Sequence, residues 1–380
     1  MGNTVFLIGN GFNRFLEQCY SADDDLCRDL DGVCSLWGRF EECLNRLLVT
    51  AGDSVRATAS EASYTTERLA QLLYDMIQFA EGLAALEQST DLASAAGIPS
   101  CHLACKEALN AHMGKSVFAV VKQFIDSETR GLYSRIFQNP PVGLTELQNL
   151  LASASAKVAL FTTNYDGLVD MVLGFEAFRG EKTGFRLVDG FGKRTDPDGV
   201  YFRDDAPDLL SQWGVRGHLH GSYKFLAQRA QNGETLYRKL TSAELDHFDA
   251  LSEGCQPVVV FDAPNRKRGR LDGFRILRQY LASFEDHLAQ AQNLVLFGIS
   301  LKDDPHLLQC IRSRWVQPAN SSGKTLCIID AEPEAVWNRV DPVATCGEPR
   351  YSLHLVAPDP DWTFEDLREV LANILTSQDD

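Results

Sequence analysis

Two short polar stretches carry the side chains best suited to chemistry in this chain. Asn164 and Asp166 follow the apolar run Val158–Phe161, and His220 follows a second apolar-to-polar transition. An amide both donates and accepts hydrogen bonds, so Asn164 can orient a hydroxyl group or an attacking water. An imidazole changes charge near neutral pH, so His220 can act as a general base. The pattern therefore indicates acid–base chemistry on a hydroxyl group or on water.

Two neighbouring residues have competing interpretations. Asp166 can orient its neighbours or stabilise developing positive charge, or it can cap the helix expected to start at Gly167. His218 lies two residues before His220 on the same predicted strand, and we assign only His220 to the site. We expect His218 to belong to the core or the surface and not to the site.

Glycines follow the ends of two predicted strands. The first strand runs directly into a loop made of Gly9, Asn10, Gly11, Phe12 and Asn13. Glycines between a strand and a helix let the backbone approach a pyrophosphate, whose charge the helix N-terminus favours. Gly298 and Ser300 follow a later strand and can hold phosphate in the same way. Asp330, after the next strand, can accept hydrogen bonds from a ribose.

These polar stretches come together only if the strands form one parallel sheet. Strands and helices alternate after Pro140-Pro141, which is typical of βαβ units. The predicted strands cover 4–8, 158–163, 215–219, 257–262, 293–299, 324–329 and 352–356. Helices are predicted over 274–291, over 305–316 with Asp303 or Asp304 as cap, and from Thr363 with a capping box. The fold class is α/β, a Rossmann-like parallel sheet with helices on both faces.

Two intervals do not follow the alternation. Apolar residues at helical spacing between 35 and 155, with almost no strand signals, predict an inserted all-helical module. The nucleotide-binding and catalytic domain would then comprise 1–34 plus 156–380. Between 174 and 212, glycines and charges predict turns and long loops over the site.

Composition excludes several classes of protein. The formal net charge of −16 argues against binding nucleic acid through the whole surface. The ten cysteines include no Cys-x-x-Cys pair, so we expect free thiols, no zinc and a cytoplasmic location. No apolar run is long enough to span a bilayer, so no membrane association is expected. The basic run Asn265–Arg270 is either a phosphate contact or a solvated loop.

The ordered set of motifs resembles the sirtuin superfamily. It is most similar to the zinc-free branch, the sirtuin-like NAD hydrolases of prokaryotic anti-phage defence. The resemblance covers 1–34 and about 156–335 and consists of Gly9-Asn10-Gly11, Thr163-Asn164-Tyr165-Asp166, Leu219-His220-Gly221, Gly298-Ile299-Ser300-Leu301 and a weaker match at Leu326–Asp330.

This resemblance implies a reaction and a set of residue roles. NAD would be the substrate, cleaved without a metal at its N-glycosidic bond to nicotinamide and ADP-ribose. Asn164, Asp166 and His220 would be catalytic. The loop at 9–13, Thr163, Gly298, Ser300 and Asp330 would bind NAD, although Thr163 replaces the glutamine usual in deacylating sirtuins. The loop that closes over nicotinamide in those enzymes has no counterpart here.

The resemblance also implies a biological setting. Such enzymes deplete NAD in abortive infection, so the activity needs control by a homo-oligomer or by a sensor such as a HerA-like ATPase or an Argonaute-type protein. Two alternatives stay open. One is a non-catalytic module that binds NAD or ADP-ribose. The other is a NAD-dependent protein deacylase, which the missing cysteine pairs disfavour.

Overall fold

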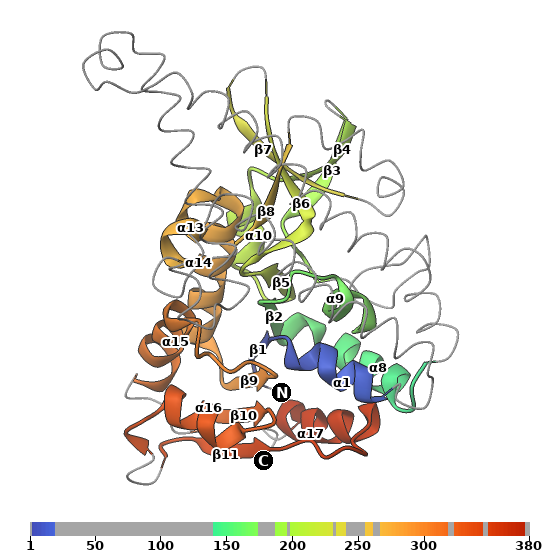
Figure 1. Cartoon of the computed structure of the whole chain (residues 1–380), viewed down its shortest axis with the longest axis vertical. Coiled ribbons are helices and arrows are strands. Elements are labelled where there is room, and N and C mark those ends of the chain that lie inside the picture. Colours follow the sequence, from blue (N-terminus) through green and yellow to red (C-terminus); the bar gives the residue numbers. More distant parts are fainter. Residues whose placement is uncertain are drawn as a thin grey trace, which may run out of the picture. The chain divides into compact units, whose positions relative to one another are not determined.

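The computed structural model of this chain describes residues 2–19, 140–173, 187–195, 198–230, 233–240, 255–260, 267–317, 323–344 and 349–376 (Figure 1). All of these residues belong to one compact unit, formed by Met1–Asp31, Ser127–Val260 and Pro264–Asp380. Most of the predicted helical module, residues 35–139, lies outside the described residues, so that insertion stays a prediction.

A parallel sheet of six strands forms the centre of the described part of the chain. Its strand order is β11-β10-β9-β1-β2-β5. The strands are β1 (Thr4–Ile8), β2 (Val158–Thr162), β5 (Val215–His218), β9 (Asn293–Phe297), β10 (Thr325–Ile329) and β11 (Ser352–Val356). Counted along the chain, this is the 3-2-1-4-5-6 order of dinucleotide-binding folds. The predicted Rossmann-like parallel sheet is confirmed.

The inner strands are apolar on both faces because helices cover both faces. Phe6, Ile8 and Leu160 meet leucines of α8 (Leu144–Ala154) and α17 (Phe364–Thr376) on one side. The alternate residues Val5 and Leu7 share a core with α14 (Arg275–Gln290) on the other side. Alternate residues of each strand therefore pack against two separate layers of helices.

The terminal signals of the predicted helices are largely present. Thr363 and Asp366 form the predicted capping box at the start of α17, with the Thr363 amide 2.8 Å from Asp366 Oδ2. The predicted helix 305–316 is divided into α15 (Pro305–Ile311) and a π-helical turn, Arg312–Val316. Helix α8, inside the interval assigned to the helical module, packs against α17 in the same unit as the sheet.

A second, antiparallel sheet corrects the prediction of loops over 174–212. Its order is β3-β4-β7-β6-β8, and its strands are β3 (Phe191–Thr195), β4 (Asp198–Phe202), β6 (Gly221–Arg229), β7 (Thr235–Lys239) and β8 (Cys255–Val259). The β3–β4 hairpin pairs Phe191 with Phe202. Glycines and charged residues interrupt the alternation of apolar and polar residues in this hairpin. Its strands are therefore recognised only from the pairing of β4 with β7. The strand predicted at 257–262 is β8 of this sheet.

The remaining described elements are short or connect the two sheets. They are α1 (Gly11–Cys19), the 3-10 turn Ser155–Lys157, α9 (Leu168–Val172), α10 (Ala206–Leu210), α13 (Lys267–Gly273) and α16 (Pro333–Val340). The four described cysteines, Cys19, Cys255, Cys310 and Cys327, are free, as predicted. No described helix has both the length and the apolar character needed to cross a membrane.

Candidate functional site

The strand order reverses between β1 and β9, and this is where ligands bind in open parallel sheets. Strand β1 ends at Ile8, and α1 begins three residues later at Gly11. The start of α1, with the positive end of its helix dipole, therefore lies at the carboxyl edge of the sheet, beside the end of β9. This reversal is the natural starting point for a site.

Three of the predicted glycines hold the two central loops against each other. The Gly9 amide donates to Phe297 O at 2.9 Å, and the Gly11 amide donates to Gly298 O at 2.9 Å. A Cβ on Gly11 would overlap Gly298 Cα, and Gly298 itself has φ 59°. Side chains here would push the loops apart, so these glycines have a packing role whatever ligand binds above them.

The other residues of the first loop divide between solvent, core and site. Asn10 is exposed. Phe12, predicted to bind a nucleotide, is fully buried and packs its ring edge-on against Phe297, with centroids 5.6 Å apart. Phe12 is therefore a core residue in this structure. Asn13 is buried and turns toward the end of β2.

Asn13 joins the two predicted residues Asn164 and Asp166 in one buried hydrogen-bonded group. Its Nδ2 donates to Asp166 Oδ2 at 2.8 Å, and its Oδ1 accepts from Asn164 Nδ2 at 3.3 Å. The backbone amide of Asn164 donates to Thr162 Oγ1 at 3.0 Å. The ends of β1 and β2 thus bring together side chains from positions far apart in the sequence.

Both interpretations of Asp166 are realised in part. Its Oδ1 accepts the Leu168 amide at 3.0 Å, at the start of α9, while its Oδ2 orients Asn13. Burial raises the pKa of Asp166, and the hydrogen bonds from Asn13 and Leu168 oppose that rise. A carboxylate kept here out of water can stabilise positive charge that develops near it.

His220 lies in the link between the two sheets, after β5 and before β6. Its carbonyl accepts the Val260 amide at 2.9 Å. Gly221 has φ 87°, and a Cβ there would overlap the Val258 carbonyl of β8, which explains the glycine after the histidine. The Tyr165 ring, between Asn164 and Asp166, lies 6.2 Å from the His220 ring, centroid to centroid. Tyr165 therefore connects the asparagine group to His220.

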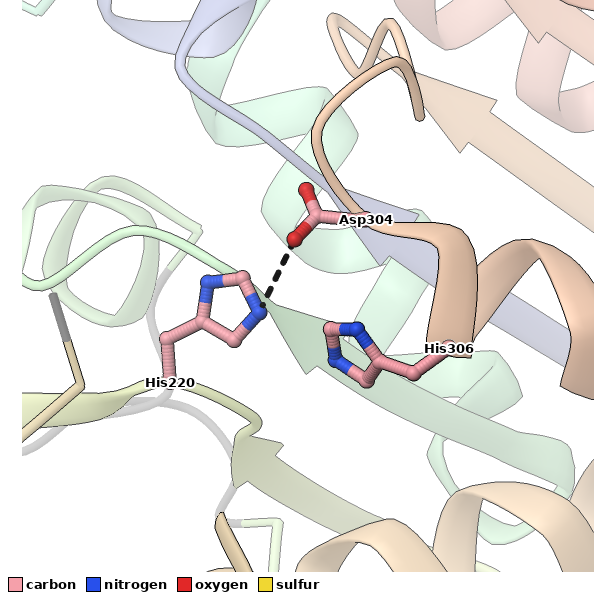
Figure 2. Close-up of side chains that lie close together, drawn as sticks. All are labelled: His220, Asp304 and His306. Atoms are coloured by element: carbon pink, nitrogen blue, oxygen red, sulfur yellow. Dashed lines mark ion pairs between the residues drawn. The ribbon is translucent and has the colours of Figure 1, made fainter. Parts of the chain in front are cut away.

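Three residues that the sequence analysis did not assign to the site surround His220. We call the four residues together the His220 cluster: His220, Lys267, Asp304 and His306. Figure 2 shows Asp304 and His306 facing His220 from the segment after β9. Asp304 Oδ1 lies 3.3 Å from His220 Nε2 and 3.0 Å from Lys267 Nζ. The His306 and His220 rings are 5.6 Å apart, centroid to centroid.

The electrostatics of the His220 cluster are asymmetric. Burial alone would raise the pKa of Asp304, but its contacts with His220 and Lys267 outweigh burial and hold that pKa well below its ordinary value, so Asp304 is charged. Burial, reinforced by the neighbouring cations, lowers the pKa of His306 to about 3, so His306 is neutral at pH 7. His220 Nε2 and both ring nitrogens of His306 are buried without a hydrogen-bond partner among the described residues. His220 Nε2 lies against Asp304, and the ring nitrogens of His306 are available to a ligand or water.

Local signals concealed these residues from the sequence analysis. Asp304 was expected to cap the helix at 305, and it does occupy the N-cap position of α15, but its side chain makes no capping hydrogen bond. Lys267 belongs to the basic run interpreted as a phosphate contact or solvated loop, yet it is 1% exposed. The useful signal was the pair Asp304 and His306, which are separated by a single residue. The pair follows a strand that ends at the same edge of the sheet.

The cluster also has the composition of a metal site. Ligand atoms of His220, Asp304 and His306 lie within 4.8 Å of one another, the one such group in the part of the chain that is described. Two imidazoles and a carboxylate are ligands that zinc uses. However, the Lys267 ammonium already contacts the same Asp304 oxygen at 3.0 Å and would repel a second cation. A hydrogen-bonded acid–base group fits these charges better.

The other predicted binding residues lie at neighbouring strand ends and make local contacts. Thr163 donates its amide to Ile8 O at 3.0 Å. Ser300 is exposed, and its Oγ accepts the Lys302 amide at 3.4 Å. Asp330 Oδ1 accepts the Glu332 amide at 3.0 Å. All three follow strands of the parallel sheet, at the edge that carries the asparagine group.

His218 belongs to a separate set of buried charges, which we call the structural network: Asp170, Asp189, Arg216, His218 and Lys239. His218 Nε2 lies 2.7 Å from Asp170 Oδ2, and its Nδ1 lies 3.3 Å from Asn164 O. Arg216 reaches both Asp170, at 2.7 Å, and Asp189, at 2.9 Å. The expectation that His218 lies in the core or at the surface is met by its burial in the core.

Neither family models nor curated proteins provide a match to this chain. What the site can do must therefore be judged from its own geometry.

Proposed function

We propose that this protein hydrolyses the N-glycosidic bond of NAD, releasing nicotinamide and ADP-ribose. One observation carries the proposal. A sheet with the strand order of dinucleotide-binding folds places the start of α1, the asparagine group and the His220 cluster at the ends of adjacent strands. The motifs that resemble sirtuin-like NAD hydrolases supply the same residues in the same order.

In the proposed reaction, water attacks the anomeric carbon of the nicotinamide ribose. The carbon–nitrogen bond breaks, and its electron pair neutralises the nicotinamide ring. His220 takes the proton that water loses, either directly or through a ribose hydroxyl. Asn164 orients that hydroxyl or the water through its amide. The buried Asp166 carboxylate stabilises the positive charge of the oxocarbenium-like transition state.

The proposed binding mode follows from the position of α1. The positive end of the α1 dipole favours the pyrophosphate of NAD, and the close contact of Gly11 with Gly298 keeps side chains out of its way. Ser300 and Asp330 would contact phosphate and the adenosine ribose from the ends of β9 and β10. Asn10 would contact the nucleotide from solvent, whereas Phe12 supports the loop from below.

The proposed biological role is depletion of NAD in anti-phage abortive infection, in the cytoplasm. This role requires the activity to be restrained. The expected means are a homo-oligomer or a sensor protein, such as a HerA-like ATPase or an Argonaute-type protein. Measuring the mass of the protein in solution beside its activity, over a range of concentrations, tests the first of these.

The deciding experiment incubates purified full-length protein with NAD, with and without an acetylated peptide, and identifies the products. We expect nicotinamide and ADP-ribose in equal amounts, independent of the peptide. O-acetyl-ADP-ribose formed only with the peptide would assign the deacylase alternative. Saturable NAD binding by calorimetry without any product would assign a non-catalytic binding module.

A further inference from the structure

Asp304 is placed as a link between a fixed cation and the His220 ring. Lys267 is almost completely buried, and its ammonium lies 3.0 Å from Asp304 Oδ1. A buried lysine that is held in this way fixes the carboxylate it contacts, because its ammonium has almost no access to water. The same Oδ1 atom lies 3.3 Å from His220 Nε2.

Asp304 also occupies a backbone position from which its side chain could cap helix α15, but it does not do so. An aspartate at the N-cap of a helix commonly accepts amides of the first turn. Asp304 is at the N-cap of α15 and makes no such bond. Its carboxylate instead points at His220, as Figure 2 shows. Instead of capping the helix, the side chain contacts His220, in the link between β5 and β6, and Lys267 of α13.

We infer that Asp304, anchored by Lys267, is the positioning residue of His220: it keeps the hydrogen of the imidazole on Nε2 and leaves Nδ1 as the base atom. This inference rests on the proposed function for the reaction that Nδ1 serves. In Figure 2, the dashed line joins Asp304 to Nε2 of His220, and Nδ1 takes no part in that contact. A carboxylate acceptor beside one ring nitrogen favours the tautomer with hydrogen on that nitrogen.

The proton balance is complete within the cluster. Nδ1 takes a proton from water or a ribose hydroxyl, and His220 becomes an imidazolium with hydrogen on both nitrogens. Asp304 stabilises that cation without itself becoming protonated. His306 stays neutral beside it and does not compete for the carboxylate charge. The present 3.3 Å separation, without an aligned hydrogen bond, is typical of catalytic contacts before substrate binds.

A purely structural salt bridge between Lys267 and Asp304 is the competing explanation, so the test needs a readout that stability alone does not change. The first readout uses wild-type protein without NAD. Histidine labelled with ¹⁵N reports by NMR which ring nitrogen carries hydrogen, and the His220→Ala spectrum identifies the His220 signals among the eight histidines. We expect hydrogen on Nε2 of His220. Hydrogen on Nδ1 would overturn the inference.

The second readout is kinetic and uses Asp304→Asn, which removes the charge and keeps the shape. We expect kcat for NAD cleavage to fall about 10²–10⁴-fold while KM changes less than about threefold. Asp303→Asn, the neighbouring aspartate in the same loop, is the matched control and should retain wild-type kcat. Equal kcat in wild type and folded Asp304→Asn would overturn the inference.

Two further measurements keep the test decisive. If Asp304→Asn fails to fold because the buried Lys267 loses the Asp304 charge, the double variant Asp304→Asn/Lys267→Met removes both charges and should show the same loss of kcat. A stoichiometric metal ion in wild type that is lost in His306→Ala would overturn the inference by making Asp304 a ligand. Hydrogen on Nε2 in a protein that cleaves no NAD would support the positioning role and refute the proposed function.

Discussion

The structural network and the His220 cluster are both buried sets of histidine, carboxylate and cation, but they differ in the hydrogen bonds of their histidine rings. Both ring nitrogens of His218 face oxygen acceptors, Asn164 O and Asp170 Oδ2. In the His220 cluster, three buried ring nitrogens have no hydrogen-bond partner among the described residues. Unpaired buried polar groups are costly, and a protein retains them where a ligand will pair them.

The two sets also differ in place. The structural network ties β5 and α9 to Asp189 and to Lys239 of β7, so it joins the parallel sheet to the antiparallel one. The His220 cluster lies where β5, α13 and the segment after β9 converge beyond the strand ends. The comparison teaches that residue type alone does not distinguish the two histidines. The hydrogen bonds of their rings do.

The largest expected effect separates the two histidines by activity. His220→Ala should reduce NAD cleavage by about 10²–10⁴-fold, the usual contribution of a positioned base, with an unchanged melting temperature. His218→Ala should lower the melting temperature, because Asp170 loses a partner, while its folded fraction keeps most of its turnover. Turnover assays paired with thermal melts check both. Near-normal cleavage by a folded His220→Ala protein would erase the distinction.

The next effect concerns stability within the structural network. Asp170 faces both Arg216 and His218, which hold its pKa well below the ordinary value despite complete burial. Asp170→Asn removes one of the two carboxylates that pair with the buried Arg216, together with the charge partner of His218, and should cost about 3–5 kcal/mol of unfolding free energy. Urea denaturation measures it. The exposed Asp286→Asn on α14 is the control and should change stability by less than about 0.5 kcal/mol.

A smaller effect is expected where the asparagine group meets the site. Asn13→Ala removes the hydrogen bond to the Asp166 carboxylate and the acceptor for Asn164. A hydrogen bond to a charged group is worth about 1.5–3 kcal/mol, so kcat should fall about 10–100-fold. Steady-state kinetics checks this. An unchanged kcat would show that Asn164 keeps its orientation without Asn13.

The glycine contact provides a matched pair of substitutions. Gly298 and Gly323 both have positive φ, of 59° and 83°, but only Gly298 has atoms where a Cβ would lie. Both changes to alanine should cost about 1–2 kcal/mol for the left-handed backbone. Gly298→Ala should additionally weaken NAD binding, measured by calorimetry. Equal affinities in the two variants would remove the β1–β9 loops from the binding site.

The smallest effects appear in the pH dependence of stability. The folded-state pKa of Asp304 lies below the ordinary 3.8, so its stabilisation is present above 3.8 and is lost as the pH falls further. The pKa of Asp166 is raised above 3.8, so its contribution is lost as the pH rises through that folded-state value. Unfolding free energy against pH should therefore become shallower below 3.8 in Asp304→Asn. It should become steeper above 3.8 in Asp166→Asn.

The parallel sheet was predictable because its strands are apolar runs that end in polar residues. Thr4–Ile8, Val158–Thr162 and Asn293–Phe297 show this pattern, and their place at the sheet centre requires it. The β3–β4 hairpin was not predictable in this way, because FGKRT and DGVYF contain glycine and charge at positions that only their neighbours explain.

The candidate site was predicted in part for a similar reason. Asn164, Asp166 and His220 stand at strand ends, and the structure does bring the first two together through Asn13. Lys267 and Asp304 were missed because local rules already accounted for them, as part of a basic run and as a helix cap. The two residues are 37 positions apart in the sequence, and only tertiary packing brings them into contact.

The sheet order has a consequence for synthesis of the protein. Asn13 and Asp166 are separated by 153 positions, and Asp304 joins His220 only after β9 has been made and inserted beside β1. A growing chain that has emerged only as far as β8 lacks a central strand and three members of the His220 cluster, Lys267, Asp304 and His306. The ribosome therefore releases most of the polypeptide before the site can assemble. A truncated product would retain the first glycine loop and both asparagines, yet it could not carry out the reaction.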